Sequence, residues 1–370
     1  MLAPPAVALG VRLRVLAESA DASAAQVVPD APVGAANDVG ALLDFARDCA
    51  VVTFDHEHVP QPVLAALAEA GVLLRPGPPA LVYAQNKAAM RARLTEAGIP
   101  CPPWALVRTA SELAAFAEDV GWPVVLKTPV GGYDGKGVLV AHGPADAEAW
   151  LDRTAATGSV LLAEARVAFA RELAVLVARS PMGQAAVWPV VETVQTDGIC
   201  TQVIAPAPGL QPDLAARATA AALKIAGDLD VTGVFAVELF EVWGADGSRD
   251  FMVNELAMRP HNSGHWTIDG SVTSQFEQHL RAVLDLPLGS AAPTAAWSVM
   301  VNVLGGDHSD LYRAYLHVMA RDPGAKVHMY GKEVRPGRKV GHVTVCGGDL
   351  ADVRARAQHA ADYISGTILE

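Results

Sequence analysis

Residues 131–137 read Gly-Gly-Tyr-Asp-Gly-Lys-Gly and restrict the fold more than any other stretch of this chain. Glycines let backbone N–H groups approach phosphate oxygens, and Lys136 adds a positive charge. The flanking stretches 124–127 and 138–141 are rich in valine and leucine, so we expect both to be strands. A Walker loop or a dinucleotide fingerprint must lead from a strand into a helix, whereas this loop joins two strands. The sequence therefore predicts a phosphate-covering hairpin lid, with Lys127 at the end of its incoming strand.

A second informative stretch, residues 254–266, follows an expected strand at 251–255 and is dense in polar side chains. Buried donors and acceptors need partners, so this density favours a site for a small oxyanion beside a metal. Pro260, Ser263 and Gly264 are also ordinary turn formers, which leaves a solvated turn as the alternative. The same three residues disfavour a helix that would present His261 and His265 as a zinc pair.

The strands before this stretch should form a hairpin, because an Asp-Gly pair at 246–247 is a strong turn signal. Centring the turn on that pair places Phe240 opposite Val253 and Glu238 opposite Glu255. Two facing carboxylates repel each other, and a Mg²⁺ ion, which prefers oxygen ligands, removes that repulsion. The alternative is a β-bulge that turns one of the two glutamates towards water.

Composition excludes several classes of protein. The 370 residues are 51% hydrophobic and carry a formal net charge of −12, which describes an acidic globular protein without a general nucleic-acid surface. Four scattered cysteines with no Cys-x-x-Cys pair fit neither a disulfide framework nor a zinc site and indicate the cytoplasm. No apolar run approaches the ~20 residues of a membrane span, and no secretory signal is evident.

Residues 1–83 alternate expected strands, at 12–17 and 50–54, with expected helices, at 38–48 and 62–70. Such alternation is typical of a Rossmann-like domain with a parallel sheet. Ligand loops lie at the C-terminal edge of such a sheet, and residues 53–60 fall there.

The rest of the chain is expected to form two further domains. Residues 84–286 begin with a helix at 84–98 and continue as a small α+β lobe at about 100–165, in which Ser111 caps a helix. A larger antiparallel lobe follows at about 166–286. Residues 287–370 form a small β-rich C-terminal domain. The fold class is therefore α/β combined with α+β.

A lysine-ended strand, a glycine hairpin, a later Glu164 and the pair of Glu238 and Glu255 together resemble the ATP-grasp superfamily. The closest rival within it is another carboxylate-amine ligase, such as a formate-using transformylase or a biotin carboxylase. A degenerate nucleotide-binding protein without turnover is the alternative from a different class. The intact lid, Lys127 and both glutamates argue against the latter.

Three motifs narrow the resemblance. Residues 131–137, 259–267 and 332–342 look like those of the 5-(carboxyamino)imidazole ribonucleotide synthases of purine biosynthesis, and the likeness covers nearly the whole chain. It implies an ADP-forming ligase that uses ATP, Mg²⁺ and bicarbonate to carboxylate 5-aminoimidazole ribonucleotide through carboxyphosphate. It also implies a homodimer.

The resemblance assigns roles to individual residues. The expected ATP-binding residues are Arg91, Lys127, Gly131, Gly132, Tyr133, Asp134, Gly135, Lys136, Gly137, Glu164, Ala165, Arg166, Val167, Glu172, Gln195, Asn254 and Glu255. Arg91 departs from many relatives, which carry lysine there. Lys87 is the competing phosphate contact, with a solvated helix face as its alternative. Glu238 and Glu255 are the expected Mg²⁺ ligands. The expected catalytic residues are Arg259, His261, Asn262 and Lys136, and the expected substrate-binding residues are Tyr133, Asp134, Lys332, Arg335, Arg338 and Lys339.

The N-terminus departs from the resemblance. Relatives begin with a strand and a Gly-Gly-Gly-Gln-Leu-type turn, followed by a helix. Here Met1 is expected to fall within that helix, with residues 2–10 as its remainder. The expectation is therefore that the first strand is missing because translation starts upstream, which would weaken stability and ribonucleotide binding.

Overall fold

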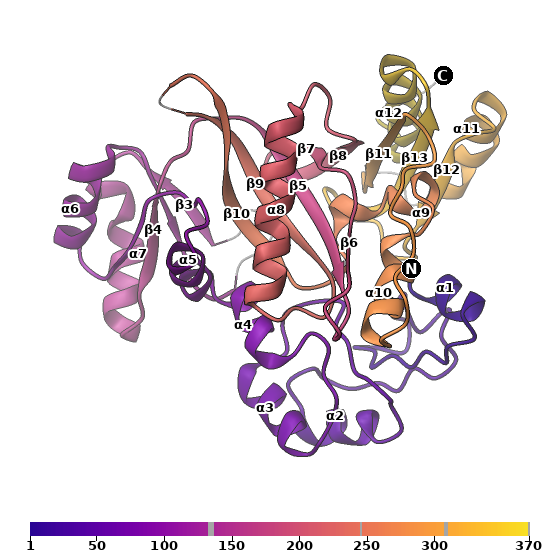
Figure 1. Cartoon of the computed structure of the whole chain (residues 1–370), viewed down its shortest axis with the longest axis horizontal. Coiled ribbons are helices and arrows are strands. Elements are labelled where there is room, and N and C mark those ends of the chain that lie inside the picture. The colour runs from indigo at the N-terminus through magenta and orange to yellow at the C-terminus, as the bar shows by residue number, and fades with distance from the viewer. Residues whose placement is uncertain (132–136, 245, 307–309, 369–370) are drawn as a thin grey trace.

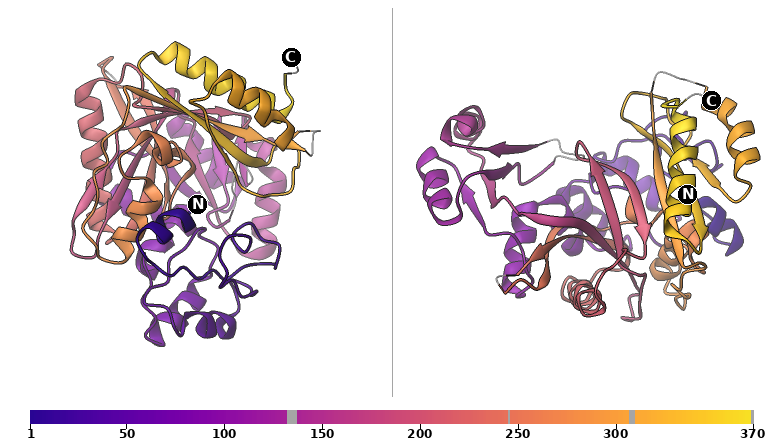
Figure 2. Two further views of the ribbon diagram at one scale, coloured as in Figure 1. Left: turned by 90° about the vertical axis from the view of Figure 1, so that its right-hand side faces the viewer. Right: turned by 90° about the horizontal axis from the view of Figure 1, so that it is seen from above.

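The structure is a computed structural model that describes residues 1–131, 137–244, 246–306 and 310–368. It is elongated, with a small lobe at one end, a large central sheet, and the C-terminal elements at the other end (Figure 1). The N-terminal segment at 39–85 lies below the central sheet, as Figure 1 and the left view of Figure 2 show.

The small lobe is a four-stranded antiparallel sheet in the order β1-β4-β2-β3, covered by two helices. Its elements are β1 (Trp104–Val107), α6 (Ala110–Val120), β2 (Val124–Lys127), β3 (Val138–Ala141), α7 (Pro144–Thr157) and β4 (Leu161–Ala165). The predicted hairpin is confirmed, since β2 pairs with β3 and places Lys127 opposite Val138. The expected cap at Ser111 is wrong, because the Thr109 side chain accepts from the Glu112 N–H and forms the capping box of α6.

The central sheet has nine strands, paired antiparallel in the order β10-β9-β5-β7-β8-β11-β13-β12, with β6 on β5. The strands are β5 (Phe169–Arg179), β6 (Ala185–Val187), β7 (Val191–Thr196), β8 (Ile199–Ala205), β9 (Gly233–Trp243), β10 (Arg249–Ala257), β11 (Trp297–Leu304), β12 (Lys326–Met329) and β13 (Lys339–Gly347). The pairing of β8 with β11 carries the sheet across residue 287 without a break.

Helices cover this sheet where its side chains are apolar. The largest, α8 (Pro212–Asp228), buries Leu214, Ala222 and Ile225 in the main core. At the C-terminal end, α12 (Leu350–Ser365) packs on β11 and β13. The remaining elements here are η1 (Asn262–Gly264), α9 (Thr267–Gly270), α10 (Gln275–Val283), η2 (Leu311–Ala314) and α11 (Tyr315–Arg321). Within the described part of the chain, no helix has the length and apolarity needed to cross a membrane.

The N-terminal part contains α1 (Ala3–Ala8), α2 (Val39–Ala46), α3 (Gln61–Glu69), α4 (Pro78–Gln85) and α5 (Lys87–Glu96). Parallel pairing is present, but only as isolated bridges that join Ala17 to Val33 and Val52 to Leu74. The stretches 12–17 and 50–54 are therefore extended segments in parallel contact, and the expectation of regular strands there was wrong.

The helix expected at 84–98 is present as α5, which begins only at Lys87 because residues 84 and 85 end the preceding helix α4. Asn86 separates the two helices with an extended backbone, and its side chain accepts from the Ala89 N–H as the N-cap of α5. The break also brings residue 86 into an antiparallel bridge with Val130, at the base of the lid. The start of α5 is thereby fixed beside the hairpin.

Candidate active site

The facing carboxylates predicted for the hairpin are present. Glu238 on β9 lies directly opposite Glu255 on β10. The register nearer the turn is one residue away from the expectation, because Phe240 faces Met252 rather than Val253. A bulge between Val253 and Glu255 restores the alignment. The bulge considered as an alternative therefore exists, but it pairs the two glutamates instead of separating them.

The loop after β10 and the start of β13 place polar groups around Glu238. Its carboxylate lies 3.0 Å from Nε2 of His261, which comes from the loop after β10. Burial favours the protonated form of Glu238, but the bond to His261 and the positive charges of Lys339 and Arg259 outweigh it and hold its pKa below the usual value. Glu238 is therefore ionised at neutral pH.

Glu172, on the neighbouring strand β5, has the opposite character. Burial and the nearby charge of Glu238 raise its pKa from 4.5 to about 7, while a hydrogen bond from Gln195 acts against the shift. The site thus holds one ionised carboxylate and one that is partly protonated at neutral pH. A ligand that donates hydroxyl hydrogens, or brings a cation, would favour the ionised form of Glu172.

Lys87 lies against the second carboxylate. Its Nζ is 2.7 Å from Glu255, and its side chain is only 14% exposed, so it is not part of a solvated helix face. Its backbone N–H bonds to the carbonyl of Pro129, at the base of the lid. Lys87 therefore joins the carboxylate pair to the hairpin that carries the glycines.

Arg91, the competing candidate, is fully buried. Its guanidinium lies 2.6 Å from Glu164 and donates to the carbonyls of Val253 and Asn254, at 3.1 and 2.7 Å. Lys127 approaches the same glutamate at 2.6 Å. Burial alone would raise the pKa of Glu164, but the two cations lower it below the usual value. In this arrangement Arg91 supports the bulge that aligns the carboxylates.

The lid lies partly outside the described residues. The end glycines, Gly131 and Gly137, have φ of 78° and 76°, which only glycine adopts without strain. The expected contacts Gly132, Tyr133, Asp134, Gly135 and Lys136 fall in the undescribed stretch. Ala165 ends β4 of the small lobe. Arg166 and Val167 belong to the segment that connects β4 to β5 of the central sheet.

The polar stretch after β10 is held by residues from other parts of the fold. Glu57 accepts from Nε of Arg259 at 2.8 Å and from the Met258 N–H at 3.2 Å. Asn262 exchanges two amide hydrogen bonds with Asn302 of β11. Glu57 was not singled out from the sequence, although the loop at 53–60 was expected at a ligand-facing edge. The signal was the charged run His-Glu-His at 56–58.

His261 and His265 point to different environments. His265 is almost fully buried and bonds through Nδ1 to Gln275 at 2.9 Å, and burial lowers its pKa well below the usual value. Gln275 also bonds to the backbone of His261 in both directions, at 2.9 and 2.8 Å. Within the described ranges, no three His, Cys, Asp or Glu residues are grouped closely enough to hold a metal on their own.

The C-terminal cations divide into two sets. Lys339, at the start of β13, is close enough to Glu238 to lower its pKa. Arg335 is exposed and pairs with Glu333 at 2.5 Å, and Arg338 donates to the carbonyl of Glu333 at 3.2 Å. Lys332 lies 5.5 Å from the ring centre of Tyr330. The structure therefore brings Lys339 to the carboxylates and leaves the others on a surface loop at 331–338.

Comparison with known proteins identifies this arrangement. The ATP-grasp domain family matches residues 92–276, the ribonucleotide synthetase preATP-grasp domain family matches residues 1–85, and the phosphoribosylaminoimidazole carboxylase C-terminal domain family matches residues 298–356. The N5-carboxyaminoimidazole ribonucleotide synthase of Mycobacterium tuberculosis (strain ATCC 25618 / H37Rv) is 52% identical over 363 residues, which are 97% of this chain and 84% of the relative. The chain belongs to the N5-carboxyaminoimidazole ribonucleotide synthase family of ATP-grasp ligases.

Other members agree over the full length. The synthase of Corynebacterium ammoniagenes is 47% identical over 366 residues, covering 98% of this chain and 89% of the relative. The solved synthetase of Thermus thermophilus has a TM-score of 0.85 at 38% identity, covering 100% of this chain and 96% of that one. The Aspergillus clavatus synthase, solved with ADP and 5-aminoimidazole ribonucleotide, has a TM-score of 0.86 at 33% identity, covering 99% and 95%.

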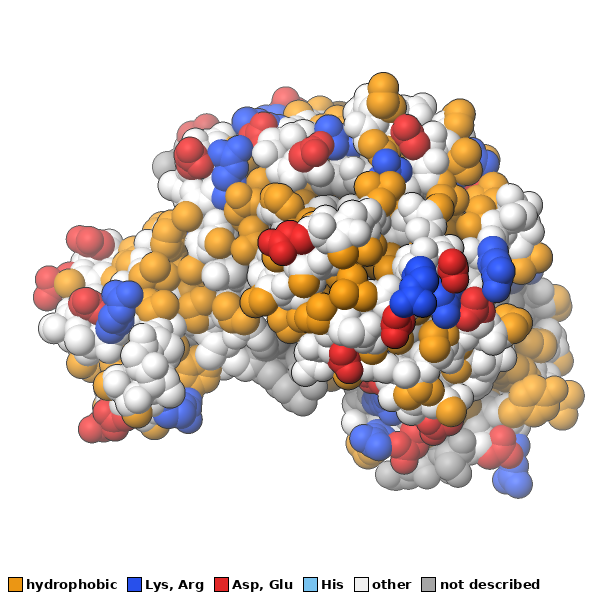
Figure 3. All heavy atoms as spheres, turned by 90° about the horizontal axis from the view of Figure 1, so that it is seen from below, with side chains coloured by type: hydrophobic (Ala, Val, Ile, Leu, Met, Phe, Trp, Pro, Cys, Tyr) orange, Lys and Arg blue, Asp and Glu red, His pale blue; other side chains and the backbone are white. Residues whose placement is uncertain are grey.

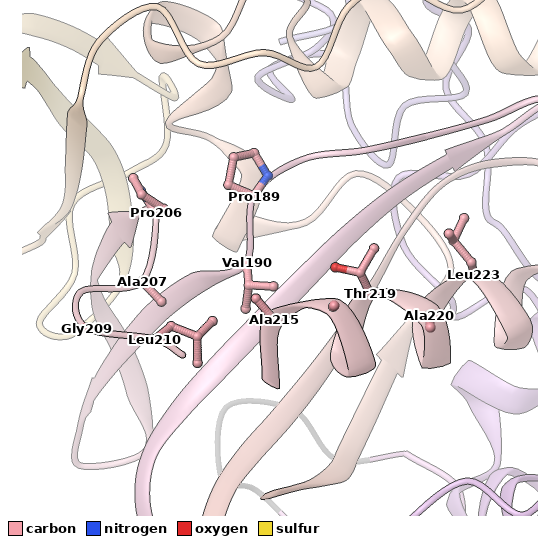
Figure 4. Close-up of a pocket in the computed structure, with 11 residues that line it drawn as sticks. Pro189, Val190, Pro206, Ala207, Gly209, Leu210, Ala215, Thr219, Ala220 and Leu223 are labelled. Carbon is pink, nitrogen blue, oxygen red and sulfur yellow. The ribbon is translucent and has the colours of Figure 1, made fainter. Parts of the chain in front are cut away.

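One hollow on the surface of this family member lies away from the carboxylates. It runs along α8 and is lined by prolines, alanines and leucines, including Pro189, Pro206, Leu210 and Leu223, with Thr219 as a polar exception (Figure 4). No charged side chain is among the described residues that line it, so it lacks the groups that a phosphate would need. On the face seen in Figure 3, lysines and arginines are scattered among acidic side chains rather than gathered into one basic field.

Proposed function

We propose that this chain carboxylates 5-aminoimidazole ribonucleotide with bicarbonate at the expense of ATP. The observation that carries the proposal is the convergence on Glu238, where a carboxylate pair, His261 and Lys339 meet. A carboxylate pair alone serves any ATP-grasp ligase. The added imidazole and lysine supply the donors needed for a small oxyanion and for an anionic second substrate.

The chemistry follows in two steps. A bicarbonate oxygen attacks the γ-phosphorus of ATP, ADP leaves, and carboxyphosphate forms. The exocyclic amine of the imidazole nucleotide then attacks the carboxyl carbon, and phosphate leaves as the amine loses a proton. Because carboxyphosphate decomposes in water, the protein acts mainly by positioning, charge neutralisation and exclusion of water.

Mg²⁺ fits the residues present. Glu238 and Glu255 face each other, and two such carboxylates with ATP phosphate oxygens make an oxygen donor set of the kind this ion prefers. When bound, the ion would neutralise charge on the phosphates. Lys87 and Lys127 would add positive charge beside the same phosphates.

The remaining residues divide by position. Glu172, with Gln195 beside it, would meet the ribose hydroxyls, and the crossing at 164–167 would meet the adenine. Arg259 would contact bicarbonate and carboxyphosphate, since Glu57 holds one edge of its guanidinium and leaves the side chain 28% exposed. The cations at 332–339 would contact the ribonucleotide phosphate.

We further propose a homodimer in the cytoplasm. The cytoplasmic assignment is supported by four free cysteines, none of which is in a disulfide. Light scattering on the purified chain tests the homodimer, and a monomer at micromolar concentration would contradict it.

The decisive assay is phosphate release from ATP. Release should require bicarbonate and increase when 5-aminoimidazole ribonucleotide is added, with one carboxylated product formed per phosphate. Glycinamide ribonucleotide with formate, and biotin with bicarbonate, are the comparison substrates for the rival ligases. Stimulation by either of them, without stimulation by 5-aminoimidazole ribonucleotide, would contradict the proposal.

A further inference from the structure

The surface loop at 331–338, called here the cationic loop, carries three of the four cations predicted to bind the ribonucleotide and is held in place at both ends. Its far end bonds to the end of β11, where the Gly337 N–H donates to the Gly305 carbonyl at 3.0 Å and the Gly305 N–H donates to the Arg338 carbonyl at 2.8 Å. Its near end follows Tyr330. The position of the first cation, Lys332, therefore depends on how Tyr330 is held.

Tyr330 is anchored through its side chain to the sheet. Its hydroxyl lies 2.7 Å from Nδ1 of His342, and its N–H donates to the carbonyl of Val340 at 2.9 Å. His342 is fully buried, and its other ring nitrogen, Nε2, has no hydrogen-bond partner among the described residues. Among the described residues, the Tyr330 hydroxyl is therefore the one side chain that hydrogen-bonds to the His342 ring.

The same imidazole lies beside the residues that hold the loop at 259–262, which carries Arg259, His261 and Asn262 and is called here the oxyanion loop. His342 on β13 is directly opposite Asn302 on β11, and Asn302 holds Asn262 by two amide bonds. The His265 ring lies 5.2 Å from the His342 ring and 6.1 Å, edge-on, from the Tyr330 ring. Side chains that fix the oxyanion loop and the side chain that anchors the cationic loop therefore meet in one buried cluster.

The cluster is uncharged at neutral pH. Burial lowers the pKa of His342 to about 3 and that of His265 well below its usual value, while burial raises the pKa of the Tyr330 phenol. The adjoining His328 stacks on His342 at 4.7 Å and bonds to Asp269 at 2.7 Å. A neutral, packed cluster of rings allows little movement, which suits a fixed spacing between two binding loops.

We propose that Tyr330 is a positioning residue. Its hydroxyl, held by His342, sets the distance between the cationic loop and the oxyanion loop. This inference rests on the proposed function, because it takes the cationic loop as the ribonucleotide site. Correct spacing holds the amine of the ribonucleotide beside the carboxyl carbon of carboxyphosphate. Loss of the spacing would leave the first step intact and impair transfer to the amine.

Tyr330→Phe tests the proposal, because it removes one oxygen and keeps the ring beneath Lys332. Tyr312→Phe is the matched control in the same domain, since Tyr312 is 76% exposed. For Tyr330→Phe we expect 5-aminoimidazole ribonucleotide to bind roughly tenfold more weakly by calorimetry, about the loss of one hydrogen bond. The KM for ATP and the bicarbonate-dependent phosphate release without ribonucleotide should stay within about twofold of wild type. More phosphate should be released per carboxylated product.

A double-mutant cycle with His342→Leu separates positioning from simple loss of stability. If Tyr330 acts through His342, removing the hydroxyl has little further effect on ribonucleotide affinity in the His342→Leu background. An equal effect in both backgrounds, or a parallel fall of all constants together with the melting temperature, would overturn the inference. An unchanged affinity of Tyr330→Phe for the ribonucleotide, measured beside an active wild type, would overturn it as well. Failure of the wild type itself to bind the ribonucleotide would count against the proposed function instead.

Discussion

Replacing Arg91 by methionine should lower the melting temperature of the protein. The change leaves Glu164, only 3% exposed, with Lys127 as its remaining cation, and leaves the carbonyls of Val253 and Asn254 without their donor. Removing one member of a buried ion pair costs about 3–5 kcal/mol, and an unsatisfied carbonyl costs about 1 kcal/mol or more. Because Lys127 stays in place, the lower end of the first range applies, and with two carbonyls left without a donor the total is roughly 5 kcal/mol.

At about 2.1 cal/mol/K per residue, a chain of 370 residues has an unfolding entropy of roughly 0.8 kcal/mol/K, so 1 kcal/mol lowers the melting temperature by about 1.3 °C and the expected drop is roughly 6 °C. Arg93→Met is the matched control, because Arg93 lies on the same helix, pairs with Glu96 at the surface and has a side chain that is 30% exposed. Its melting temperature should change by no more than about 1–2 °C, roughly what a surface pair contributes.

ATP titration of the same variants separates the two roles considered for Arg91. Lys87→Met should weaken ATP binding while changing the melting temperature little, since its partner Glu255 is 40% exposed. If Arg91→Met instead melts like the Arg93 control and loses ATP affinity a hundredfold, Arg91 contacts the phosphates and the structural argument is wrong.

The other predictions concern turnover and pH. Glu238→Gln or Glu255→Gln should lower kcat about a thousandfold with the fold retained, because each removes a Mg²⁺ partner; near-normal turnover would exclude the metal assignment. Arg259→Ala should lose bicarbonate-dependent turnover while ATP still binds, and an unaltered bicarbonate dependence in coupled ADP release would remove it from the oxyanion site. Lys332→Ala should raise the KM for the ribonucleotide and not that for ATP; the reverse result would mean that the cationic loop was misassigned. Because the folded pKa of Glu172 is about 7 against an ordinary 4.5, its protonation stabilises the fold fully below pH 4.5, and this contribution is lost as the pH rises to 7. Glu172→Gln should remove that loss, at most roughly 3 kcal/mol in urea unfolding, and an unchanged pH profile would contradict the assigned pKa.

The carboxylate pair shows how a sequence prediction can succeed through a local error. Centring the turn at 246–247 gave a register one residue away from that observed near the turn, and the bulge at Asn254 cancelled the difference. A bulge has no reliable side-chain signature. Here it is supported by a buried arginine 162 and 163 residues away in sequence, at Val253 and Asn254. Such a partner is set by tertiary packing and cannot be read from one chain.

Features that depend on local pattern were the most predictable. The glycine hairpin, the antiparallel lobes and the polar loop after β10 followed from strand and turn signals. Contacts between distant segments were not predictable, as with Glu57 and Arg259, which are 202 residues apart. The strands expected at 12–17 and 50–54 were wrong for another reason. Both stretches are extended chain in which only Ala17, Val52 and Phe54 are buried, and among the described residues each forms a single isolated bridge. A run of hydrophobic residues in the sequence predicts burial, but a regular strand forms only where another strand of similar length lies beside it.

The unbroken sheet across residue 287 determines where this molecule can bend. Since β8 pairs with β11 over four residues, the C-terminal elements share a hydrogen-bonded ladder with the strands that carry Glu172 and Glu238. Opening a hinge there would break that ladder and expose two strand edges. The small lobe, by contrast, has a separate sheet of its own. Nucleotide exchange is therefore expected to involve movement of the lobe at 104–165 against the central sheet, and such movement must strain or break the buried Arg91–Glu164 pair that joins the two.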